Sequence, residues 1–144
     1  VVSTTGTVTA LGIYGTTVGG TNRTCFVDST GLLGGLTSIR ASKMDISPMP
    51  SQGWVYDLAP VTFKFRAKDE EGNYTDTPDG GIQYGLIAEE VEQVNPDFCY
   101  YSNDGKLEGV AYEKLAVPLL REIQNLKAEL DAAKERIAVL EAKS

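Results

Sequence analysis

The sequence contains no histidine, and it has only two cysteines. The absence of histidine excludes Ser-His-Asp and Cys-His catalysis and leaves an ordinary zinc site without its usual ligand. Cys25 and Cys99 are isolated and lack the spacing of a metal site. We predict buried free thiols at both positions, and the sequence alone leaves a disulfide between them open. Any nucleophilic reaction in this chain therefore needs a lysine or a carboxylate as its base.

Long apolar runs and a basic surplus are also missing. No stretch is long enough to span a bilayer, and the N-terminal residues show no signal-peptide pattern. The net charge of −7 comes from residues 39–112, because residues 1–38 and 113–144 are each balanced. An acidic body disfavours nucleic acid and anionic membranes, so we expect neither as a partner. Because the first residue is Val rather than Met, we expect a longer parent chain.

The stretch from residue 119 to residue 144 follows the heptad pattern of a coiled coil. Its apolar positions recur at alternating spacings of four and three, at Leu119, Ile123, Leu126, Leu130, Ala133, Ile137 and Leu140. Flanking residues five positions apart carry opposite charges, beginning with Glu122 and Lys127, as parallel helices in register require. We predict a self-associating helix, with an amphipathic helix lying on its own domain as the alternative.

Residues 1–37 are rich in glycine and threonine, and Arg23 and Asp28 are their charged residues. Threonine and valine favour strands, whereas frequent glycine allows tight turns and close approach of backbones. Such a segment buries little by itself, so we predict a short β-rich stalk intertwined among subunits. The heptads alone leave dimer and trimer open. With this stalk ahead of the helix, we predict a parallel homotrimer.

The middle of the chain predicts a small mixed body. Apolar residues at helical spacing cover residues 51–59. Residues 61–66 alternate as a half-buried strand with Phe65 inward, and residues 82–86 form a second short strand. The acidic residues between these strands, 68–81, predict a solvated loop, because they lack the order of a calcium-binding loop.

Further along, residues 86–94 predict a short helix whose Glu89, Glu90 and Glu92 form a solvated face. Residues 98–101 and 107–111 then flank an Asn-Asp-Gly-Lys sequence that indicates a hairpin. The long helix begins near Tyr112, and Pro118 either kinks it or starts it anew. The predicted class is α+β: a β-rich stalk, a mixed body with hairpins, and a long helix that forms a parallel trimeric coiled coil.

Four stretches in a fixed order carry a resemblance to a known family. The first has Ser38, then Lys43 five residues on, followed by Asp45 and Ile46. The others lie at residues 58–65, 84–91 and 110–120, and include Gly-Leu-Ile-Ala-Glu-Glu-Val and Pro-Leu-Leu. From Ser38 onward the sequence resembles the intramolecular chaperone domain of phage tail spikes and fibres, the self-cleaving, endosialidase-type peptidase S74 family.

The resemblance implies a domain that trimerises, guides folding of the fibre ahead of it and then cuts itself away between Thr37 and Ser38. Ser38 would be the nucleophile and Lys43 the general base, which agrees with the absence of histidine. Arg40, or backbone amides near Gly34–Gly35, would support the oxyanion. The resemblance implies no cofactor and no metal.

The residues themselves set two conditions for such a dyad. On a strand, positions i and i+5 face opposite sides, so a turn or a neighbouring chain must bring Ser38 and Lys43 together. A lysine base must also be neutral, whereas free lysine is charged at neutral pH. Apolar surroundings favour the neutral amine, and Met44 and Ile46 are the local candidates. Ser42 is a rival nucleophile.

The resemblance divides the chain into the end of a fibre (1–37), a chaperone body (38–112) and a coiled-coil helix (113–144). The expected partners are further copies of the chain, as a homotrimer, and the upstream fibre segment of the same polypeptide. The expected location is a viral tail-fibre precursor assembled in the host cytoplasm. One alternative is a permanent trimerisation and capping module that never cuts. Another is a receptor-binding tip that uses residues 68–81.

Overall fold

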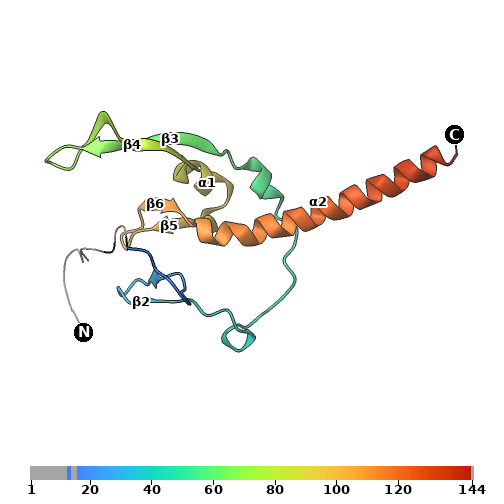
Figure 1. The fold of residues 1–144 in the computed structure, drawn as a ribbon, viewed down its shortest axis with the longest axis horizontal. Helices are drawn as coiled ribbons and strands as arrows, with labels where there is room; N and C mark the ends of the chain where they lie inside the picture. The colour runs from blue at the N-terminus through green and yellow to red at the C-terminus, as the bar shows by residue number, and fades with distance from the viewer. Residues whose placement is uncertain (1–12, 14–15, 144) are drawn as a thin grey trace. The chain divides into compact units, whose positions relative to one another are not determined.

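The computed structural model describes residue 13 and residues 16–143, and these fall into two compact units that meet after Ile46. Figure 1 shows small hairpins and one long helix. The predicted mixture of helix and hairpin sheets is therefore confirmed, whereas the trimeric coiled coil stays a prediction. The first residues of the predicted stalk lie outside the described residues, and the predicted domain boundaries also stay predictions.

The first unit is built on a short hairpin. Strands β1 (Phe26–Val27) and β2 (Leu33–Gly34) pair antiparallel. The Asp28 carboxylate closes the turn by accepting hydrogen bonds from Thr30 Oγ1 at 2.6 Å, Thr30 N at 2.8 Å and Leu32 N at 3.0 Å. These bonds, with that of the Thr30 hydroxyl foremost, lower the pKa of Asp28. Local hydrogen bonds rather than burial therefore hold this hairpin.

The second unit contains the remaining hairpins and the α-helices. Its sheets are separate two-stranded ribbons. In order, the elements are the 3₁₀ helix η2 (Gly53–Asp57), strands β3 (Val61–Lys68) and β4 (Tyr74–Gly85), helix α1 (Ala88–Val94), the 3₁₀ helix η3 (Pro96–Phe98), strands β5 (Cys99–Tyr101) and β6 (Leu107–Val110), and helix α2 (Tyr112–Glu141). The hairpin after α1 and the start of α2 at Tyr112 agree with the sequence predictions.

The prediction of a loop over residues 68–81 is wrong. Strand β4 begins at Tyr74 and pairs with β3, and the turn between them is closed by Asp69, whose carboxylate accepts a bond from Asn73 N at 2.8 Å. Pro78 is tolerated because a two-stranded ribbon leaves one edge of β4 unpaired. Phe65 is 58% exposed rather than inward, because the register shifts after Phe63.

The body of the second unit packs around a small core. Val91, Cys99, Val110 and Leu115 are buried there, so α1, the β5–β6 hairpin and the start of α2 share one core. Trp54 of η2 covers this core. The helix predicted over residues 51–59 is only this 3₁₀ segment, because Gly53 and Pro60 leave no room for an α-helix.

The two cysteines have different environments, and both are free thiols. Cys99 belongs to the core, and burial raises the pKa of its thiol. Cys25 is exposed. The prediction of buried free thiols is therefore right for Cys99 and wrong for the burial of Cys25.

Helix α2 runs through Pro118 as one element, and its Glu122 is buried against residues 51–56. The Glu122 carboxylate accepts hydrogen bonds from Gln52 N, from Ser51 Oγ at 3.0 Å and from Asn125 Nδ2 at 3.0 Å. The bond from the Gln52 amide is the main cause of its lowered pKa. This carboxylate, which the heptad pattern placed on the flank of a coiled coil, is thus hydrogen-bonded within its own chain, and its predicted pairing with Lys127 of another chain stays a prediction.

Candidate functional site

A hydrogen bond joins the predicted nucleophile and the predicted base. Lys43 Nζ lies 2.8 Å from Ser38 Oγ. A 3₁₀ turn, η1 (Arg40–Ser42), lies between the two residues, and Lys43 N donates to Arg40 O at 3.1 Å. The turn that the spacing required is therefore present within one chain. An amine at this distance from a hydroxyl can take its proton.

The same turn occupies the hydroxyl of Ser42, the rival nucleophile. Ser42 donates from its backbone N at 3.1 Å and from its Oγ at 2.8 Å to the Ile39 carbonyl. The Ser42 hydroxyl is thus used to close the turn, whereas the Ser38 hydroxyl is bonded to the amine. Asp45 then takes a left-handed conformation with φ 52°, which aspartate tolerates better than most residues.

The peptide bond predicted to be cut lines an open recess of about 540 Å³ in the first unit. Its walls include the residues on both sides of the bond together with the start of the hairpin: Arg23, Thr24, Phe26, Gly35, Leu36, Thr37, Ser38 and Ile39. Gly35 is among them, but Arg40 is not. Sequence reasoning missed Arg23, whose one signal was a cation in a segment nearly free of charge.

The site is open to solvent in a single chain. Ser38 and Lys43 are exposed. Met44 and Ile46, the predicted apolar surroundings, are 83% and 52% exposed. A dry environment for the amine is therefore not built by these neighbours along the chain.

The predicted coiled-coil positions form an exposed apolar row on α2. Figure 1 shows the C-terminal part of α2 extending past the other elements of its unit. Six of the predicted core residues are between 44% and 64% exposed: Leu119, Ile123, Leu126, Leu130, Ile137 and Leu140. Ala133 is exposed as well. Such a continuous apolar face is typical of an association surface.

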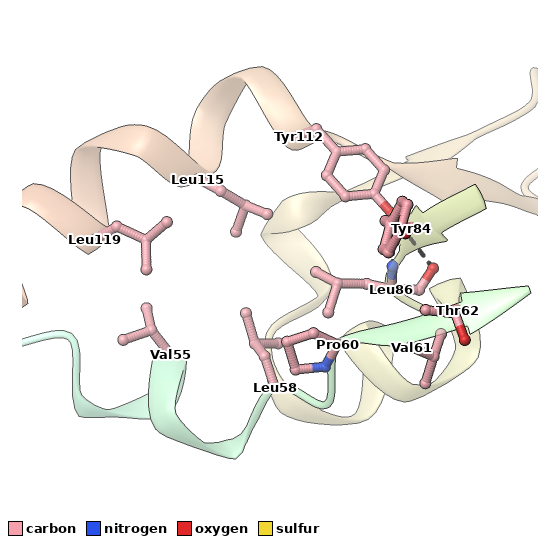
Figure 2. Close-up of a pocket in the computed structure, with 11 residues that line it drawn as sticks. Val55, Leu58, Pro60, Val61, Thr62, Tyr84, Leu86, Tyr112, Leu115 and Leu119 are labelled. Atoms are coloured by element: carbon pink, nitrogen blue, oxygen red, sulfur yellow. Dashed lines mark hydrogen bonds between the residues drawn. The ribbon is translucent and has the colours of Figure 1, made fainter. Parts of the chain in front are cut away.

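An apolar groove of about 650 Å³ adjoins the start of this row. Figure 2 shows Leu119 and Leu115 of α2 on one side and Val55 and Leu58 on the other. Thr62, Tyr84 and Tyr112 contribute hydroxyls to its lining, and that of Tyr112 accepts a hydrogen bond from Leu86 N at 2.6 Å. The groove holds no nucleophile paired with a base, so it is a packing surface rather than a second reaction site.

The described residues contain neither a group of three or more His, Cys, Asp or Glu that could hold a metal ion nor a helix that could cross a membrane. Comparison with protein families gives one match, the chaperone of endosialidase, or peptidase S74, over residues 40–100. Residues 40–100 are therefore similar to the chaperone-of-endosialidase family. No curated protein matches the chain.

The match confirms the resemblance seen in the sequence and covers somewhat less than half of the chain. It includes Lys43 and ends within β5, so it begins just after Ser38 and ends before α2. The family is associated with phage tail proteins. The similarity to this family thus covers the middle of the chain, whereas Ser38 and the predicted coil lie outside the matched segment.

Proposed function

We propose that this chain is an intramolecular chaperone that trimerises and guides folding of the viral tail-fibre segment ahead of it. It then releases itself by cleavage between Thr37 and Ser38, and the fibre precursor is assembled in the host cytoplasm. The observation that carries the proposal is the 2.8 Å hydrogen bond between Lys43 Nζ and Ser38 Oγ, located at the bond to be cut. The chaperone-of-endosialidase match supports it.

The chemistry follows from Ser38 being the residue after the cut. Its Oγ attacks the Thr37 carbonyl carbon while Lys43, as a neutral amine, takes the hydroxyl proton. The tetrahedral intermediate collapses, the C–N bond breaks, and Lys43 returns the proton to the departing Ser38 amine. Water then hydrolyses the resulting ester. One water is consumed, and the products are a Thr37 carboxylate and a Ser38 amine with its hydroxyl restored.

Trimerisation would cover the apolar row of α2 and exclude water around Lys43, neither of which a single chain does. The exposed apolar row of α2 favours association with further copies through Leu119, Ile123 and the heptad positions that follow. Neighbouring subunits would also exclude water around Lys43, which lies exposed in one chain, and so favour its neutral amine. We therefore expect cleavage only in the assembled trimer.

Intact-mass spectrometry of the purified chain tests the reaction. We expect a fragment that begins at Ser38, and we expect Ser38→Ala and Lys43→Ala to abolish it. Ser42→Ala retains cleavage, because the Ser42 hydroxyl bonds the Ile39 carbonyl instead of Lys43. A full-length mass after prolonged incubation of a confirmed trimer would favour the alternative, a permanent trimerisation and capping module. Light scattering that shows a monomer at micromolar concentration would contradict both.

A further inference from the structure

Arg23 lies at the open end of the hairpin that leads to the bond to be cut. Phe26 stands opposite Gly34, and Val27 stands opposite Leu33. When this antiparallel register is continued past Phe26, Arg23 falls opposite Thr37. The observed pairing ends at Phe26 and Gly34, and continuing its register places Arg23 beside the residue whose carbonyl the proposed reaction attacks.

The packing of the Arg23 side chain agrees with this register. A Cβ placed on Gly35 would lie 2.6 Å from Arg23 Cδ and 3.2 Å from Arg23 Nη1. The arginine side chain thus lies across the backbone of Gly35, where any larger residue would collide with it. Arg23 also lines the recess that Thr37 and Ser38 line, so the guanidinium and the reacting bond share one open space.

The guanidinium of Arg23 is available for an anion. It makes no ion pair or hydrogen bond within the part of the chain that the structure describes. Arginine keeps its charge at every pH of interest and offers several N–H donors in a planar fork. Arg40, the residue predicted for this role, does not line the recess.

We propose that Arg23 stabilises the oxyanion that forms on the Thr37 carbonyl during the self-cleavage proposed above, on which this inference rests. As Ser38 Oγ bonds to the carbonyl carbon, the π electrons move to the oxygen, and the guanidinium of Arg23 faces that charge. The charge disappears again when the C–N bond breaks, and Arg23 keeps its protons throughout.

If Arg23 has this role, the rate of cleavage depends on the folding of the fibre segment that is cut off. Arg23 precedes the cut and belongs to the fibre side of the chain, whereas Lys43 belongs to the chaperone side. Arg23 and Thr37 line one recess in the chain whose β1 and β2 are paired, and we expect this arrangement to require that pairing. Cleavage therefore requires a folded fibre end as well as an assembled chaperone.

The test is the rate at which the full chain yields the fragment that begins at Ser38, measured by intact mass. Arg23→Gln should slow this rate about 10²-fold, the usual loss when an oxyanion donor is removed. Arg23→Lys should retain part of the rate because it keeps the charge. Arg40→Gln should cost less than Arg23→Gln. The matched control is Arg66→Gln, on β3 of the second unit, which should leave the rate unchanged.

Two further measurements separate an electrostatic role from a structural one. Millimolar guanidinium chloride should accelerate cleavage of Arg23→Ala and should not accelerate the Arg66→Ala control, which keeps Arg23. Gly35→Ala should slow cleavage by displacing the Arg23 side chain, whereas Gly19→Ala, which meets open space, should not. Light scattering and thermal melting confirm that each variant is a folded trimer.

The outcomes distinguish this inference from the proposed function. An unchanged rate in Arg23→Gln, while Ser38→Ala abolishes cleavage, overturns the role of Arg23 and leaves the Ser-Lys reaction standing. The role of Arg23 is likewise overturned if Arg40→Gln costs as much as Arg23→Gln, or if guanidinium fails to rescue folded Arg23→Ala. A wild-type chain that never cleaves as a trimer overturns the inference together with the proposed reaction.

Discussion

The two units of this chain are stabilised in different ways. In the described part of the first unit no side chain is buried, and Phe26 is the one that is half-buried. Its hairpin and the η1 turn are held by local hydrogen bonds. The second unit has a buried core around Val91 and encloses the Glu122 carboxylate. The candidate chemistry thus lies in the unit with the least packing, and the helix proposed to drive assembly lies in the other.

This difference shows that short-range structure can bring reactive groups together without making them reactive. The η1 turn places Ser38 beside Lys43, but it does not exclude water from either. Exclusion of water needs apolar surface from other chains, which α2 is suited to recruit. Stability and cleavage should therefore respond to different substitutions.

The largest effect should come from charges in the predicted coil. Ile123→Asp combined with Leu130→Asp would bury charge between helices, and we expect loss of both trimer and cleavage. The core around Val91 lies elsewhere in the second unit, so the helical circular dichroism of the body should remain. Light scattering and intact mass measure the two losses.

The control for this pair places the same charges on outward-facing positions of α2. Ala128→Asp with Ala138→Asp imposes a similar cost in helix propensity but leaves the heptad row intact. It should remain a cleaving trimer. Cleavage by a monomeric Ile123→Asp/Leu130→Asp chain would show that assembly and reaction are not coupled.

A core substitution should separate the two units thermodynamically. Leu115→Ala removes a side chain that is 7% exposed, and we expect it to lower the free energy of unfolding by about 2–5 kcal/mol. Leu32 lies in the turn of the first unit and is 67% exposed. We expect Leu32→Ala to change the free energy of unfolding by less than about 0.5 kcal/mol. Urea denaturation in the monomeric Ile123→Asp/Leu130→Asp background measures both, and equal losses would contradict this difference between the units.

The turn of the first hairpin should affect cleavage more than stability. Asp28→Ala removes the acceptor of three hydrogen bonds, and loosening of the β1–β2 register should slow cleavage several-fold. The melting temperature of the second unit should not change. Asp104→Ala supplies the matched control, because Asp104 closes the β5–β6 turn through Ser102 and Lys106. Asp104→Ala should leave the cleavage rate unchanged. If Asp28→Ala and Asp104→Ala slowed cleavage equally, the first hairpin would have no specific role in the reaction.

Sequence reasoning predicted the elements that depend on local patterns and missed those that depend on pairing. The hairpin after α1, the start of α2 and the need for a turn before Lys43 followed from turn residues and spacing. The end of β4 agrees with the strand predicted over residues 82–86, whereas its first part, residues 74–81, was predicted as a loop. Asp, Pro and Gly residues there disfavour strands, and pairing with β3 overrides that preference.

The two missed charged residues share a cause. The heptad register predicts on which face of the helix Glu122 lies. It does not predict that residues 51–56 pack against that face. Arg23 likewise has no motif around it, and its packing against Gly35, in the recess that Thr37 also lines, is evident only in the folded chain. In both cases the deciding contact joins segments whose relative position no local pattern encodes.

The smallest effect that we predict is a pH dependence of the second unit. Hydrogen bonds from Gln52 N, Ser51 and Asn125 lower the pKa of Glu122. A lowered folded-state pKa stabilises the protein above the pKa of an unfolded glutamate, about 4.3, and this contribution is lost as the pH falls through the folded value. Stability should therefore decrease below about pH 4.3, measured by urea denaturation across a pH series.

Glu122→Gln tests whether this carboxylate is responsible. The amide keeps the shape of the side chain but cannot titrate, so the variant should be less stable than wild type at neutral pH and should lose less stability on acidification. Glu135→Gln makes the same change at an exposed, outward position of α2 and serves as the control. If Glu122→Gln retained the full acid dependence of wild type, Glu122 would not anchor residues 51–56 through its charge. The shifted carboxylates of Asp69 and Asp104 would then account for the acid sensitivity.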